Sequence, residues 1–114
     1  MQAFRREAFR YTAYFCEENI WWAARDLVDA GFDPACMQVL LFTNPSQSVV
    51  LLNQRAAPEG APVAWDYHVV LQAGMDNAMQ IFDLDSRLDF PVSRSVYVPG
   101  TFPRQSTLPQ RYRT

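Results

Sequence analysis

Long apolar runs, blocks of like charge and low-complexity segments are all missing from this sequence of 114 residues. A membrane-spanning helix needs roughly 18 consecutive apolar residues, and no run in the chain approaches that length. Hydrophobic residues make up 49% of the chain and charged residues 19%, which is a globular rather than a disordered composition. We therefore expect one globular domain over residues 1–114, with no membrane partner.

The sequence also lacks a large excess of charge of either sign. Its formal net charge is −2, which gives no reason to expect nucleic acid or an anionic membrane as a partner. The first residues, MQAFRREAFRY, are charged where a signal peptide would carry an apolar core. We expect a monomeric cytoplasmic protein.

Histidine and cysteine are scarce. His68 is the only histidine, and one histidine with scattered carboxylates does not make a zinc site, so we expect no metal and no other cofactor. Cys16 and Cys36 are the only cysteines. In a reducing cytosol they are expected to be free thiols rather than a disulfide.

The apolar pattern predicts a helix first and strands afterwards. Residues 17–30, EENIWWAARDLVDA, place Ile20, Ala24, Leu27 and Val28 at helical spacing before a glycine, so Cys16 lies at the helix N-terminus. Apolar runs predict strands over 37–42, 48–54, 63–72 and 79–84, with a weak short strand near 95–98 and irregular chain after Pro99. This order is typical of an α+β fold with an antiparallel sheet.

The stretch WDYHVVLQAGMDNAMQIFDLD, residues 65–85, predicts a hairpin with a loop over 73–78. A symmetric hairpin places His68 opposite Asp83, and Asp66 opposite Asp85, on one face. The other face is predicted to be a core face, formed by Trp65, Tyr67, Val69 and Leu71 against Phe82 and Leu84. From the hairpin alone, a catalytic His–Asp pair and a structural hydrogen-bonded pair are equally good interpretations.

Cys16 is the candidate nucleophile because of its place at a helix start. A helix N-terminus or a nearby imidazolium favours a thiolate, which is the reactive form of cysteine. Glu17 and Glu18 oppose a thiolate unless their carboxylates point away. The alternative for Cys16 is a small buried hydrophobic residue. Cys36, in the loop before an apolar strand, is predicted to be the core cysteine.

Three segments resemble the motifs of the protein N-terminal glutamine amidohydrolases. They are YFCEENIWW (14–22), APVAWDYHVVL (61–71) and IFDLDSRLDFP (81–91), within a resemblance that covers about residues 11–98. The resemblance implies a papain- and transglutaminase-like α+β fold, in which an N-terminal helix with the cysteine packs on an antiparallel sheet with the histidine and aspartate. It also implies a catalytic triad of Cys16, His68 and Asp83.

The activity implied is deamidation of an N-terminal glutamine side chain of a protein or peptide to glutamate, with release of ammonia. An acidic acceptor is then needed for the substrate α-ammonium group, and Asp66, Asp85 and Glu17 are the candidates. Surface solvation or turn capping is the alternative role for these carboxylates.

The resemblance also implies a longer protein than this one, with a C-terminal half that has no counterpart here. A fragment, a minimal active form and a degenerate copy are all compatible with the sequence. Two other functions stay open: a transglutaminase-like cysteine hydrolase acting on another amide, and a catalytically inactive binding domain.

Overall fold

The computed structural model describes residues 5–13, 15–75 and 78–114. Its helices and strands are, in chain order, α1 (Cys16–Asp29), β1 (Met37–Phe42), β2 (Val49–Leu51), β3 (Val63–Trp65), β4 (His68–Met75), β5 (Ala78–Phe82), β6 (Val92–Ser93) and α2 (Arg94–Thr101). One antiparallel sheet has the order β1-β4-β5-β6, and β2 pairs with β3 in a separate two-stranded sheet. The predicted α+β class with an N-terminal helix and an antiparallel sheet is confirmed.

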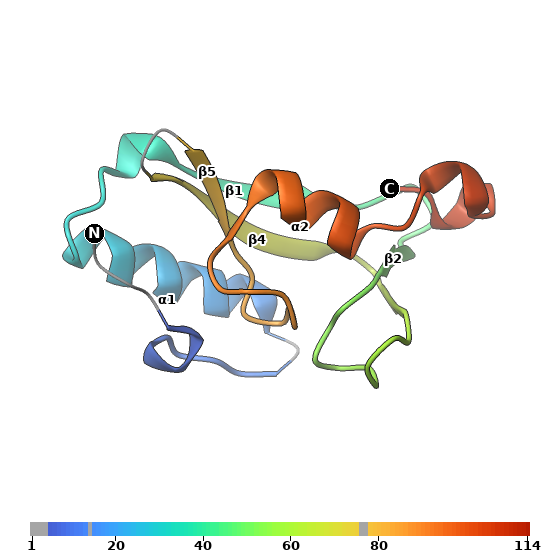
Figure 1. Cartoon of the computed structure of the whole chain (residues 1–114), viewed down its shortest axis with the longest axis horizontal. Coiled ribbons are helices and arrows are strands. Elements are labelled where there is room, and N and C mark those ends of the chain that lie inside the picture. Colours follow the sequence, from blue (N-terminus) through green and yellow to red (C-terminus); the bar gives the residue numbers. More distant parts are fainter. Residues whose placement is uncertain (1–4, 14, 76–77) are drawn as a thin grey trace.

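Helix α1 packs against one face of the four-stranded sheet (Figure 1). Its buried apolar residues are Ile20, Ala23 and Leu27, which meet a sheet face formed by Val69, Leu71, Phe82 and Leu84. Burying a Val, Leu, Ile or Phe side chain stabilises the fold by about 1.5–3 kcal/mol. Val28, predicted to lie in the apolar stripe, is 41% exposed.

Helix α2 covers the opposite face of the sheet (Figure 1). Its Tyr97 is fully buried against Val70, Ile81 and Val92. The predicted short strand near 95–98 is therefore wrong, although the run SVYV has strong β propensity. Burial of Tyr97 outweighs that local preference, and Pro99 inside the helix removes only one helical N–H.

The β4–β5 hairpin has a register two residues away from the predicted one. Leu71 pairs with Phe82 and Gln72 with Ile81, whereas the prediction paired residue 70 with residue 81. A two-residue shift keeps every side chain on its predicted face, but the predicted cross-strand pairing of His68 with Asp83 is wrong. The strands extend to Met75 and Ala78, inside the predicted loop, and residues 76–77 lie outside the described residues.

The predicted strand over 63–72 is split at Asp66 and Tyr67. Its first part, β3, leaves the main sheet to pair with β2, and its second part, β4, pairs with both β1 and β5. Tyr67 is consequently 40% exposed, so its predicted place in the core is wrong. The break matters for the site, because residues 64–68 line a pocket there.

Large apolar side chains are exposed on α1 and on the edge strand β1. Trp21, Val39 and Leu41 are 56%, 61% and 60% exposed.

None of the helices in the described part of the chain has the length and apolar character needed to cross a membrane.

Candidate active site

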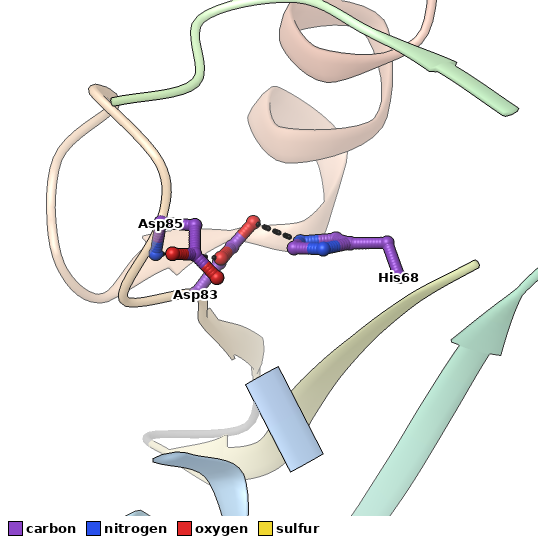
Figure 2. A group of neighbouring side chains, drawn as sticks. All are labelled: His68, Asp83 and Asp85. Atoms are coloured by element: carbon purple, nitrogen blue, oxygen red, sulfur yellow. Dashed lines mark hydrogen bonds and ion pairs between the residues drawn. The ribbon is translucent and has the colours of Figure 1, made fainter. Parts of the chain in front are cut away.

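The imidazole of His68 and the carboxylate of Asp83 form a buried ion pair. His68 begins β4, and Asp83 directly follows β5. The distance from His68 Nε2 to Asp83 Oδ2 is 2.8 Å (Figure 2). The two residues are only 1% and 3% exposed. The predicted contact between these side chains is therefore present, although the backbone pairing behind it differs from the predicted one.

Asp83 receives two further hydrogen bonds. The hydroxyl of Tyr97 donates to Oδ2 at 2.7 Å, and the backbone N–H of Asp85 donates to Oδ1 at 3.0 Å. Both carboxylate oxygens thus have donors, which a buried carboxylate requires if it is to stay ionised. Tyr97 comes from α2, so both helices and the sheet between them contribute to the site.

The ion pair controls the protonation of both partners. Burial alone would lower the pKa of His68, but the charge and hydrogen bond of Asp83, with a smaller contribution from a hydrogen bond with Cys16, raise it to about 10. Burial would raise the pKa of Asp83, but His68, Tyr97 and the Asp85 N–H hold it below its usual range. At neutral pH the pair is an imidazolium facing a carboxylate.

Cys16 is the first residue of α1 and lines the same pocket as His68. The chain before it is fixed by Asn19, a buried residue whose side chain makes two hydrogen bonds to the backbone of Thr12. The preceding residue, Phe15, makes no side-chain capping bond to the helix. The free N–H groups of the first helical turn, where Cys16 lies, are therefore not capped by that side chain.

The two cysteines differ from the predicted arrangement in one respect. Cys16 is half-buried and Cys36 is exposed, so the prediction that Cys36 is the core cysteine is wrong. Cys36 ends a short 3-10 turn that leads into edge strand β1. Both thiols are free, as predicted.

A pocket of about 300 Å³ opens beside Cys16 and His68. Two of the three predicted acceptors for the substrate amine, Asp66 and Asp85, also line it. The third, Glu17, accepts a hydrogen bond from the Tyr67 hydroxyl and lines an adjacent apolar groove instead. The structure therefore brings Asp66 and Asp85 to the pocket and directs Glu17 away from it.

Asp85 is the more buried of these two carboxylates, at 8% exposure. Burial raises its pKa, the hydrogen bond from the Tyr11 hydroxyl at 2.8 Å works against this shift, and the negative charge of Asp83 adds to it. A buried anion with a raised pKa is stabilised when a cation binds beside it.

In the part of the chain that the structure describes, one group of side chains could hold a metal ion. Its donor atoms, from His68, Asp83 and Asp85, all lie within 4.8 Å of one another. A metal ion there would have to displace the hydrogen bonds that these groups already make with each other and with Tyr97 and Tyr11. The donor set therefore fits a hydrogen-bonded acid–base network better than it fits a metal site.

Sequence reasoning did not identify Tyr97 or Tyr11 as site residues. The local pattern around Tyr97 predicts a weak strand, and Tyr11 precedes the first predicted element. A fully buried tyrosine needs a partner for its hydroxyl, but the sequence gives no signal of which residue that partner is.

Comparison with known proteins identifies the family. The sequence model of the family described as N-terminal glutamine amidase matches residues 11–114. This chain, with a buried His–Asp pair beside a cysteine at a helix start, belongs to that family.

Its curated relatives include proteins named protein N-terminal glutamine amidohydrolase. The human protein of that name is 34% identical over 113 residues, which cover 95% of this chain and 54% of the human protein. The protein from Oryza sativa subsp. indica is 37% identical over 99 residues, covering 80% of this chain and 43% of the rice protein. The Arabidopsis thaliana protein is 33% identical over 100 residues, with shares of 82% and 45%. The chain thus spans about half the length of the curated relatives it matches.

Proposed function

We propose that this protein deamidates the side chain of an N-terminal glutamine in proteins or peptides to glutamate and releases ammonia. The observation that carries the proposal is the buried His68–Asp83 pair, with its 2.8 Å contact, beside Cys16 in one pocket. Family membership and the names of the relatives support the choice of substrate. A papain- and transglutaminase-like arrangement, a cytoplasmic location and a monomeric state belong to the same proposal.

In the first half of the reaction, Cys16 attacks the side-chain amide carbon of glutamine. Asp83 occupies Nε2 of His68, which leaves Nδ1 as the ring nitrogen that holds the proton taken from the Cys16 thiol, so that the pair reacts as a thiolate and an imidazolium. The new S–C bond gives a tetrahedral oxyanion. When that collapses, the C–N bond breaks, and the imidazolium gives its proton to the departing ammonia.

In the second half, water hydrolyses the thioester. His68 takes a proton from the water as its oxygen attacks the carbonyl carbon, and the C–S bond breaks to give glutamate and free Cys16. The backbone N–H of Cys16, in the first turn of α1, is our candidate donor to the oxyanion in both halves. Asp83 keeps the ring in one orientation and stabilises its positive charge.

The substrate α-ammonium group distinguishes an N-terminal glutamine from an internal one. We propose Asp85 as its acceptor, with Asp66 as the more exposed alternative in the same pocket. Asp85 already has one oxygen engaged by Tyr11, which orients the carboxylate. Glu17 is the weakest of the three predicted acceptors, because it hydrogen-bonds to Tyr67 and lines the adjacent apolar groove rather than this pocket.

Mass spectrometry of a peptide that begins with glutamine tests the proposal. We expect a mass gain of about one dalton at the first residue with the wild-type chain, since an amide becomes an acid, and no gain with Cys16→Ala. The matched control is Cys36→Ala, which removes the other thiol and should leave the activity unchanged.

The same experiment separates the two other functions. Deamidation of internal or non-glutamine amides, with none at the first residue, would favour another cysteine hydrolase of transglutaminase type. A well-folded wild-type chain that changes no peptide would favour an inactive binding domain.

A further inference from the structure

The phenol of Tyr97 shares a single carboxylate oxygen with His68. Tyr97 Oη lies 2.7 Å from Asp83 Oδ2, and His68 Nε2 lies 2.8 Å from the same atom. Tyr97 is fully buried in the core on the α2 face of the sheet. The phenol is therefore held in place by packing, and its hydroxyl acts on Asp83 from the side away from α1 and Cys16.

We propose that Tyr97 is a positioning residue that fixes the Asp83 carboxylate and keeps it ionised, so that Asp83 can hold the His68 ring for catalysis. The catalytic part of this inference rests on the proposed function. Tyr97 itself is not one of the residues that line the pocket beside Cys16. It acts through Asp83.

The physical basis is the cost of burying a carboxylate. Asp83 has no exposed face through which water could solvate it, so its charge depends on the three groups that donate to it. The Asp85 N–H holds Oδ1, while Tyr97 and His68 meet at Oδ2. Loss of the Tyr97 hydroxyl removes one of these donors, makes Asp83 easier to protonate and leaves its Oδ2 free to move away from the ring.

The hydrogen bond between Tyr97 and Asp83 shifts the pKa values of both groups. The hydrogen bond from Tyr97 lowers the pKa of Asp83, and the same carboxylate, together with burial, raises the pKa of the Tyr97 phenol well above its usual value. The phenol therefore stays protonated and remains a donor across the working pH range. Without it, the acid-side titration of the His68–Asp83 pair moves to higher pH.

The sole histidine makes this titration directly observable. The Cε1–H resonance of His68 is the only histidine signal in the chain, so proton NMR follows the pair in the intact protein without any substrate. This readout is independent of activity. Failure of the proposed amidase function would thus leave the inference about Tyr97 testable.

The test compares Tyr97→Phe with wild type by NMR titration and by the pH profile of kcat/KM. We expect the acid-side inflection of both to move up by about one pH unit, with kcat/KM reduced about tenfold to a hundredfold, as for loss of one hydrogen bond to a charged group. Tyr112→Phe is the matched control. Tyr112 lies in the 3-10 turn Gln110–Tyr112 with its ring against Arg111, and it is not among the groups that bond to Asp83. It should leave both inflections unchanged.

A second substitution keeps the test decisive if Tyr97→Phe does not fold. Incorporation of 3-fluorotyrosine at position 97 preserves the packing and makes the phenol a stronger donor, so the acid-side inflection should move to lower pH. Opposite shifts in the two variants support the inference. A folded variant whose inflection stays at the wild-type pH would overturn it, whatever its loss of stability.

Discussion

His68 and Asp83 meet diagonally across the hairpin rather than face to face. The ladder between β4 and β5 ends at Leu71 opposite Phe82, and continued in the same register it would place residue 70 opposite residue 83. Side chains two residues off a direct pair are still within reach of each other when one of them is long or aromatic. The imidazole spans that offset and brings its Nε2 atom to 2.8 Å from Asp83.

Replacing Asp83 with asparagine should separate folding from catalysis. The amide is nearly the same size and can still accept from Tyr97, so we expect a cooperative fold. It cannot stabilise the imidazolium or hold its tautomer, so kcat should fall by about 10⁴-fold. Circular dichroism and steady-state kinetics on the same sample are the measurements. Retention of more than a tenth of wild-type kcat by the folded variant would exclude the role assigned to Asp83.

Alkylation should show that Cys16 reacts because of His68. Exposure alone favours Cys36, since that thiol is the more exposed of the two. With iodoacetamide at pH 6 we nevertheless expect Cys16 to react faster, because an imidazolium nearby favours the thiolate.

The control for this experiment is the same alkylation in His68→Ala. The rate at Cys16 should fall to that of an ordinary thiol, while the rate at Cys36 stays constant. Peptide mapping by mass spectrometry assigns each rate. A Cys16 rate that does not respond to loss of the imidazole would mean that the thiol is not activated by it.

The stability of the chain should depend on pH through the buried pair. The pKa of His68 is raised from 6.5 to about 10, so the folded state holds a proton that the unfolded state loses between these values. The stabilisation from the pair is therefore complete below pH 6.5 and declines as the pH rises through about 10. The lowered pKa of Asp83 means that its contribution is lost only as the pH falls below its usual value of 3.8.

Urea unfolding at a series of pH values measures this dependence. The difference in free energy of unfolding between wild type and Asp83→Asn should be largest between about pH 3.8 and pH 6.5. It should shrink as the pH rises toward about 10. The comparison cancels the titration of other groups. A difference that stays constant from neutral pH to pH 10 would contradict the charged state assigned to the pair.

Asp85→Asn should affect binding of the substrate more than the chemical step. If Asp85 accepts the substrate α-ammonium group, its loss raises KM about tenfold or more, as expected for loss of a hydrogen bond to a charged group. Asp66→Asn is the matched control in the same pocket and should have the smaller effect. A larger rise in KM for Asp66→Asn would move the acceptor role to Asp66.

The sequence predicts the bounds of those elements whose local apolar pattern is strong, even where, as in β1, much of the apolar surface stays exposed. The helix over residues 17–30 is found as Cys16–Asp29, and the strand 37–42 is found as Met37–Phe42. The helix has apolar residues at helical spacing before a glycine, and the strand is a short apolar run that ends before a turn. Alternation within the hairpin also places His68 and Asp83 on one face, which is why their contact could be predicted although the register was wrong by two residues.

The remaining errors come from interactions distant in sequence. The register depends on the connection between β4 and β5, and a symmetric loop is the simplest prediction from a segment without an apolar pattern. The run around Tyr97 has strand propensity but forms a helix, because its phenol is buried against the sheet and donates a hydrogen bond to Asp83. Exposure of Cys36 follows from the position of β1 at the sheet edge, which the local sequence does not encode.

Ammonia release from two matched peptides tests the central claim most directly. One peptide begins with a free glutamine and the other with the same glutamine acetylated at its α-amine, and both are incubated with the 114-residue chain and with Cys16→Ala. The account predicts ammonia from the free peptide with the wild-type chain only, and little from the acetylated one, because acetylation removes the charge that an acidic pocket binds. A well-folded wild-type chain that releases no ammonia from the free peptide would contradict the account.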